Sequence, residues 1–183
     1  VPEDLMAVAN GKLTATKKNT NGTTTYQWTV VNPINNYGVA LNVADYVHFS
    51  DPYKGMKGTL ACDYYVLPEN LEKAKVQFKQ AHLMLEAFEH WFGPYPFYED
   101  SYKLVEGVGM EHQSSVGYSG EFINGQRGSD LSGSGWGLKF DYLIIHESGH
   151  EWFANNITYK DMADMWVHEG FTTYSEALYV EYH

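Results

Sequence analysis

The sequence predicts an α+β protein, with a β-rich piece over residues 1–58 and a mixed segment over residues 59–183. Two observations carry this prediction. The first piece contains runs of β-branched and aromatic residues, separated by turn signals such as the one at residues 19–22. The second piece contains a stretch from Leu71 to Phe92 whose apolar residues recur at spacings of three and four, as on the buried face of a helix.

Each remaining element is predicted from local signals. The strand candidates are bounded by Asn, Asp, Gly or Pro and lie at residues 12–17, 23–30, 39–43, 46–49, 59–67 and 101–106. Gly93-Pro94 predicts the end of the first helix. The glycine-rich residues 119–137 predict a loop. Two further helices are predicted, one with Asp141 as its N-cap and one over residues 166–182.

The composition argues against several classes of site. The net charge is −11 at pH 7 and Arg127 is the only arginine, whereas a nucleic-acid partner requires clustered lysine or arginine. Cys62 is the only cysteine, so an intrachain disulfide and a cysteine-based metal site are both excluded. We interpret Cys62 as a small buried residue in a strand. No apolar run reaches the roughly 18 residues that a membrane span requires.

The third helix candidate contains the sequence His-Glu-x-x-His, formed by His146, Glu147 and His150. Residues four apart on a helix lie on the same face, so both imidazoles can point at one cation. Imidazole nitrogens suit zinc, and Glu147 would lie beside the ion as a general base for a water molecule. The motif can arise by chance, but the apolar residues that surround it here indicate a buried helix.

A third ligand is predicted on the last helix. Eighteen residues separate His150 from Glu169, which would face the two histidines and leave the fourth position of one zinc ion open, as a catalytic site requires. Glu176, about two turns further on, shares the face of Glu169 and is predicted to accept the spare ring N–H of a ligating histidine. His168 is not predicted as a ligand, because adjacent helix residues point about 100° apart.

This pattern, followed by Gly-Phe-x-x-Tyr at residues 170–174, resembles the gluzincin metallopeptidases and, within them, the M1 aminopeptidases. Residues 107–112, Gly-Val-Gly-Met-Glu-His, resemble the Gly-x-Met-Glu-Asn exopeptidase motif of the M1 family, with His112 in place of the usual Asn. The role of His112 is left unassigned.

The resemblance implies a zinc-dependent aminopeptidase that removes N-terminal residues from peptides. Glu111 would bind the free α-ammonium of the substrate, and a substrate-binding backbone would come from Gly107, Val108, Gly109 and Met110. Residues 1–58 would be the end of a β-rich N-terminal domain. Residues 59–183 would be the N-terminal half of a thermolysin-like catalytic domain, with a small mixed sheet beside the helices that carry the zinc site.

The chain opens at Val1-Pro2 and stops just after a helix-like run, so we expect it to be a fragment of a longer protein. The tyrosine with which the family stabilises the oxyanion is assigned to no residue, and the isolated fragment is expected to bind zinc with little or no peptidase activity. Three alternatives stay open: another gluzincin such as an endopeptidase, the epoxide hydrolase branch related to M1 enzymes, and a non-catalytic zinc-binding module.

Overall fold

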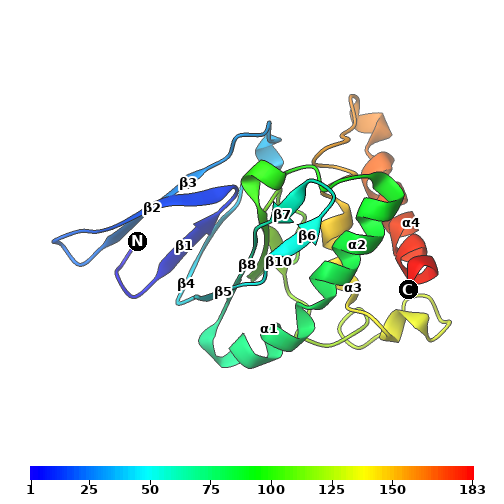
Figure 1. The fold of residues 1–183 in the computed structure, drawn as a ribbon, viewed down its shortest axis with the longest axis horizontal. Coiled ribbons are helices and arrows are strands. Elements are labelled where there is room, and N and C mark those ends of the chain that lie inside the picture. The colour runs from blue at the N-terminus through cyan, green and yellow to red at the C-terminus, as the bar shows by residue number, and fades with distance from the viewer.

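The computed structural model describes all of residues 1–183 and confirms the α+β class (Figure 1). The N-terminal piece consists of β1 (Met6–Ala9), β2 (Lys12–Lys18), β3 (Thr24–Thr29) and β4 (Leu41–Ala44). β2 and β3 form the antiparallel hairpin that the turn residues predicted, and β1 pairs antiparallel with β4. These strands extend away from the helices.

A four-stranded mixed sheet with the order β10-β9-β8-β5 forms the centre of the molecule. β8 (Cys62–Val66), β9 (Tyr102–Glu106) and β10 (Val116–Tyr118) are parallel, whereas β5 (Val47–Ser50) runs antiparallel to β8. A separate hairpin joins β6 (Tyr53–Gly55) to β7 (Gly58–Leu60). Because β5 precedes residue 58 and pairs with a strand that follows it, pairing alone does not divide the chain there, and the boundary at residue 58 stays a prediction.

Four α-helices lie beside this sheet: α1 (Leu71–Gln77), α2 (Gln80–Phe92), α3 (Tyr142–Gly149) and α4 (Trp166–Tyr182) (Figure 1). The bounds of α4 are the predicted ones. The single helix predicted over residues 71–92 is wrong, since the chain breaks between α1 and α2 at Phe78. Both helices pack on the same core, so apolar residues recur at spacings of three and four from α1 into α2. None of the helices combines the length and the apolar character that crossing a membrane requires.

Short 3₁₀ turns connect the larger elements. They are η1 (Asn36–Gly38), η2 (Pro68–Asn70), η3 (Tyr98–Asp100), η4 (Trp136–Leu138) and η5 (Met162–Asp164). Between β10 and α3, residues 119–137 contain no strand or α-helix, as the glycine-rich sequence predicted.

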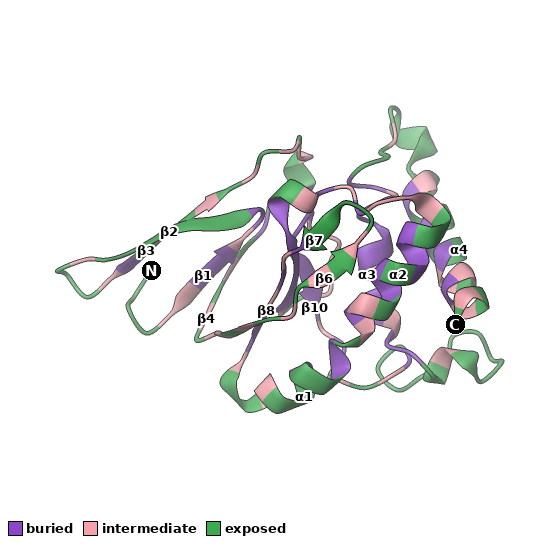
Figure 2. Ribbon diagram, viewed as in Figure 1, coloured by how far each residue is buried: buried purple, intermediate pink, exposed green.

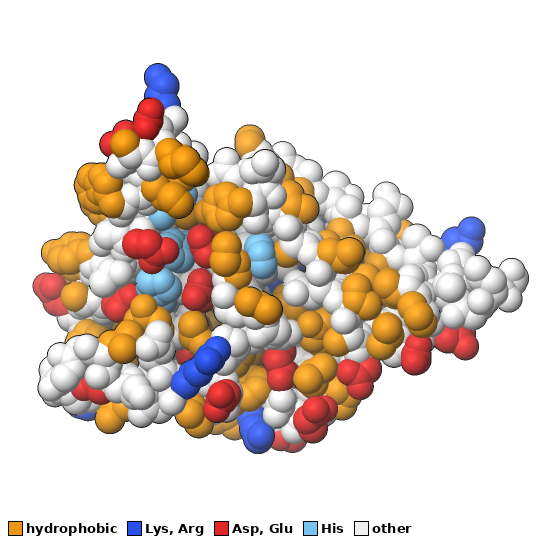
Figure 3. Space-filling view, turned by 180° about the vertical axis from the view of Figure 1, so that it is seen from behind, with side chains coloured by type: hydrophobic (Ala, Val, Ile, Leu, Met, Phe, Trp, Pro, Cys, Tyr) orange, Lys and Arg blue, Asp and Glu red, His pale blue; other side chains and the backbone are white.

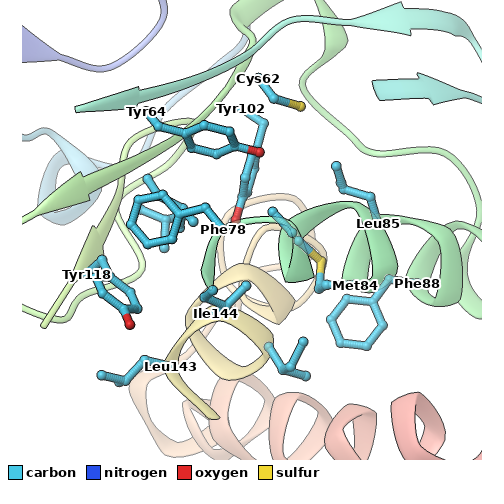
Figure 4. Close-up of a cluster of buried hydrophobic side chains, with 14 of the residues drawn as sticks. Cys62, Tyr64, Phe78, Met84, Leu85, Phe88, Tyr102, Tyr118, Leu143 and Ile144 are labelled. Carbon is cyan, nitrogen blue, oxygen red and sulfur yellow. The ribbon is translucent and has the colours of Figure 1, made fainter. Parts of the chain in front are cut away.

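The hydrophobic core lies between the sheet and the helices, and the N-terminal strands are mostly exposed (Figure 2). Tyrosine rings from three sheet strands meet apolar side chains from α2 and α3 in this core (Figure 4). The labelled residues are Cys62, Tyr64, Phe78, Met84, Leu85, Phe88, Tyr102, Tyr118, Leu143 and Ile144. Cys62 is fully buried in β8, as predicted. The core anchors the inner faces of α2 and α3 and thereby fixes the helix that carries the His-Glu-x-x-His sequence.

Candidate metal centre and substrate cleft

The start of α3 is fixed by Asp141, which is fully buried. Its Oδ1 atom accepts hydrogen bonds from the backbone N–H groups of Leu143 at 3.1 Å and Ile144 at 3.3 Å, as an N-cap residue does. Its Oδ2 atom accepts from Tyr118 Oη at 2.6 Å and from Gln77 Nε2 at 2.7 Å. The first turn of α3 is therefore tied to the sheet and to α1, which sets the direction of the histidines that follow.

The structure brings His146, His150 and Glu169 together at one point. His146 Nε2 lies 3.3 Å from Glu169 Oε2, and His150 Nε2 lies 3.5 Å from Glu169 Oε1. The ligand atoms of the three side chains lie within 4.8 Å of one another. Histidine and acidic side chains gather in a hollow on this face of the molecule (Figure 3). Two imidazole nitrogens and one carboxylate are a usual donor set for zinc.

The far nitrogen of each imidazole ring is held by the protein. His146 Nδ1 lies 2.7 Å from Glu176 Oε1 and 3.2 Å from Tyr142 Oη, and the Tyr142 ring stacks on His146. His150 Nδ1 lies 3.0 Å from the carbonyl oxygen of Phe153 and 3.1 Å from Thr172 Oγ1. Both Nε2 atoms therefore face Glu169.

Sequence reasoning proposed Glu176 as a partner of a histidine but missed two other contacts at these rings. Tyr142 lies one helical turn before His146, so its spacing was a usable signal. Thr172 lies on another helix and gave no local signal.

A second acidic group adjoins the first. Ligand atoms of Glu111, Glu147 and His150 also lie within 4.8 Å of one another. Burial, together with the negative charges of Glu111 and Glu169, raises the pKa of Glu147 to about 7. Burial lowers the pKa of His150.

No lysine or arginine forms a salt bridge with any carboxylate of this group or with Glu176. A concentration of carboxylates without a lysine or arginine partner, of which Glu169 is exposed and the others are half-buried, fits a bound divalent cation. The residues present therefore fit the zinc ion that the sequence pattern implied.

The segment from Gly107 to Met110 follows β9 and bends back beside β10, where Met110 forms an antiparallel bridge with Gly117. Gly107 N donates to Tyr118 O at 2.8 Å, and Gly117 N donates to Met110 O at 2.8 Å. A Cβ atom at Gly117 would overlap the carbonyl oxygen of Val108, so the close approach of these two backbones requires glycine there. Val108 in this segment is 78% exposed. Gly109 packs against Ser119 and Leu143.

A cavity of about 360 Å³ borders Glu111 and Glu169. Tyr37 lines it from the N-terminal piece, and the sequence gave no signal for this residue, which η1 carries to the site from far along the chain. The remaining lining residues are Asn36, Met110, Tyr159, Met165 and His168. Burial and the charge of Glu111 raise the pKa of Tyr37.

The two remaining histidines near the site do not join the proposed ligand set. His168 Nε2 lies 3.2 Å from Thr158 Oγ1, and the residue belongs to neither of the two candidate ligand groups. His112 is half-buried, and burial lowers its pKa.

The model of the Peptidase family M1 domain matches residues 77–183, more than half of the chain, and the chain therefore belongs to this family. Endoplasmic reticulum aminopeptidase 1 from Mus musculus is 23% identical over 175 residues, which are 93% of this chain and 18% of that protein. Glutamyl aminopeptidase from Bos taurus is 30% identical over 128 residues, 64% of this chain and 13% of the relative.

Solved structures show the same fold. The M1 zinc metallopeptidase from Deinococcus radiodurans superimposes with a TM-score of 0.72 and 25% identity, covering 98% of this chain and 38% of that one. A mutant of an M1 zinc metallopeptidase from the same organism, bound to a Tyr-Ser-Ala substrate, superimposes with a TM-score of 0.70 and 24% identity. The chain thus spans less than half of these structures and, at 18% of the first curated relative, about a fifth of that protein's length.

Proposed function

We propose that this chain forms part of a zinc-dependent aminopeptidase that removes N-terminal residues from peptides. The observation that carries the proposal is the convergence of two ligand groups, one made by His146, His150 and Glu169 and the other by Glu111, Glu147 and His150. The first group can hold a cation. The second places two further carboxylates at its border, one for proton transfer and one for recognition of an amine. The aminopeptidase names of the relatives support the same reaction.

His146, His150 and Glu169 would hold a zinc ion, which would supply a Lewis acid for the scissile carbonyl group and for the attacking water. Glu147 takes the proton from the attacking water and passes it to the nitrogen of the leaving amine. Burial raises the pKa of Glu147 to about 7 in the metal-free protein, and the charge of a bound cation would lower it, which would favour the carboxylate form that accepts the proton.

Glu111 binds the free α-ammonium group of the peptide, so that the bond after the first residue reaches Glu147. The segment from Gly107 to Met110, called the substrate edge below, receives the peptide backbone as an added strand.

Two variants of the natural full-length protein test these roles. Glu147→Gln is expected to keep its zinc and to lose about 10²–10⁴-fold in kcat, since proton transfer disappears while the ligands stay. Glu111→Ala is expected to raise KM for an aminoacyl-anilide and to narrow the preference for that substrate over its N-acetylated form. Glu181→Gln, an exposed carboxylate on α4, is the control. Hydrolysis that survives Glu147→Gln would remove the mechanism. Equal cleavage of free and acetylated substrates by the unaltered protein would favour an endopeptidase.

A further inference from the structure

The loop from Glu111 to Ser115, called the Glu111 loop below, is held by hydrogen bonds to its backbone and to the side chains of Gln113 and Ser114. Gln113, Ser114 and Ser115 have no exposed surface. Ser114 adopts a φ of 54°, a left-handed conformation that costs free energy for a residue with a side chain and persists only where the surroundings enforce it. The enforcing contacts come from two parts of the chain that are far apart in sequence.

The first contacts come from the turn that follows α3. Asn155 Nδ2 donates to the carbonyl oxygen of Glu111 at 2.8 Å, and Glu151 Oε1 accepts from Ser114 N at 2.7 Å. Asn155 and Glu151 are both buried, at 8% and 0% exposure. The same turn carries His150, whose carbonyl oxygen accepts from Asn155 N at 2.9 Å. The backbone that positions a proposed zinc ligand therefore also positions Glu111.

The second contacts come from the N-terminal β piece. Asn10 Nδ2 donates to Gln113 O at 2.6 Å and to Gly38 O at 2.8 Å, while Asn10 Oδ1 accepts from Ala40 N at 2.7 Å. Gly11 N donates to Ser114 Oγ at 2.9 Å. The Asn10 side chain, 4% exposed, thus ties the Glu111 loop to η1, which carries Tyr37 to the cavity beside Glu111.

We propose that Asn155 and Asn10 are positioning residues for recognition of the substrate amine, with one clamp from the turn that follows α3 and the other from the N-terminal β piece. The inference rests on the proposed role of Glu111. The direction of the Glu111 carboxylate follows from where its backbone is held, and a displacement of about 1 Å at a site of this kind can cost on the order of 10²-fold in rate. Asn10 lies outside residues 77–183, so part of the amine site is set by chain beyond the matched family domain.

The test uses the natural full-length protein with Asn155→Ala and Asn10→Ala. The controls are Asn156→Ala, an exposed neighbour of Asn155, and Asn21→Ala, an exposed residue of the N-terminal piece. Each variant is assayed for KM and kcat on a free and an N-acetylated aminoacyl-anilide, for zinc content, and for hydrogen exchange of the peptide covering the Glu111 loop. We expect KM for the free-amine substrate to rise about tenfold in both Asn→Ala variants, with kcat changed less than threefold, zinc retained and exchange of the loop faster.

The outcomes separate the possible failures. An unaltered protein that does not prefer the free amine would refute the proposed function and the inference with it. A preference that persists unchanged in Asn155→Ala and Asn10→Ala, with control-like exchange of the loop, would refute the inference alone. Equal losses on both substrates together with loss of zinc would show a merely structural role. If an alanine variant does not fold, Asn155→Ser and Asn10→Ser, which keep a small polar side chain, decide the same question.

Discussion

Glu176 holds His146 from the side opposite Glu169: its Oε1 atom lies 2.7 Å from Nδ1, and Nε2 of the same ring lies 3.3 Å from Glu169 Oε2. Both glutamates stand on α4, seven residues apart and therefore on one helical face. A single helix thus supplies a carboxylate to each side of the same imidazole. The hydrogen bond at Nδ1 turns Nε2 towards the cation site and makes it a better donor.

The first prediction concerns the hydrogen bond between Glu176 and His146. Glu176→Ala leaves the three proposed ligands in place but removes the partner of His146 Nδ1, so zinc affinity is expected to fall about 10–100-fold. Competition with a zinc chelator measures the change. Glu181→Ala, an exposed glutamate on the same helix, is the matched control and is expected to keep the affinity of the unaltered protein. An unchanged affinity in Glu176→Ala would mean that Tyr142 alone orients the ring.

The second prediction concerns Gly149, which lies where α3 meets α4. A Cβ atom there would come within 3.0 Å of Ser175 Oγ and of Thr172 Cγ2. Thr172 also lies against His150 Nδ1, so pushing α4 outwards disturbs the metal site. Gly149→Ala is expected to lower the free energy of unfolding by about 1–3 kcal/mol through overpacking, although alanine favours the helix by about 1 kcal/mol. Zinc affinity is expected to fall with it.

Gly170→Ala is the matched control for urea unfolding of Gly149→Ala. Gly170 is an exposed glycine of α4, and a Cβ atom there would meet only the ring of Trp166, at 3.3 Å. This variant is expected to be neutral or more stable by up to about 1 kcal/mol. If the two variants had equal stability, α3 and α4 would not be in the tight contact that the geometry indicates.

How far the sequence predicts the site depends on whether a contact is local. His146 lies on α3, and Asp141 and His150 cap its two ends, so the helical period with the capping rule sufficed to place all three. Glu169 was predicted from its spacing after the His-Glu-x-x-His sequence. The bond from Asn10 to Gln113 spans 103 residues, and no period or turn signal reports such a contact. The break at Phe78 was missed for a related reason, because periodicity identifies a buried face and not the point at which the axis turns.

The third prediction concerns the pH dependence of stability and rests on Lys103, which is 1% exposed. Its Nζ atom donates to the carbonyl oxygen of Gly11 and to Ser101 Oγ. Burial lowers the pKa of Lys103 from 10.5 to about 7, against the attraction of nearby carboxylates. The titratable groups whose charges act on it are Asp63, Glu151, Asp100 and Lys12, and burial raises the pKa of Glu151 itself to about 8.

The unfolded chain binds the proton of the Lys103 ammonium group more tightly than the folded chain does. The free-energy cost of burying the charged lysine is therefore complete below about pH 7 and absent above about pH 10.5. The free energy of unfolding therefore rises with pH between about pH 7 and pH 10.5. Relative to Lys103→Met, the unaltered protein is expected to gain up to roughly 4 kcal/mol between pH 7 and pH 10. Urea unfolding of both proteins at the two pH values measures the difference. A gap that stays constant would mean that Lys103 keeps its charge in the fold.

The last prediction concerns the substrate edge. Gly117 lets the backbone of residues 108–110 cross close to β10, and a Cβ atom at this position would overlap the carbonyl oxygen of Val108. Gly117→Ala is therefore expected to displace the edge that is proposed to pair with the peptide, raising KM for a peptide substrate about tenfold or more. His146, His150 and Glu169 do not touch this strand, so zinc content is expected to stay the same.

Gly107→Ala controls for the general effect of adding a methyl group to this segment. The nearest protein atoms to a Cβ at Gly107 lie 3.8 Å away, so the added methyl group meets no clash. This variant is expected to match the unaltered protein in zinc content and melting temperature. A peptide whose second residue is N-methylated lacks one strand hydrogen bond. It gives a second comparison between the unaltered protein and Gly117→Ala. If the edge pairs with substrate, methylation weakens binding to the unaltered protein and has less effect on Gly117→Ala, in which the pairing is already disturbed. Equal weakening in both would mean that the peptide lies elsewhere in the cleft.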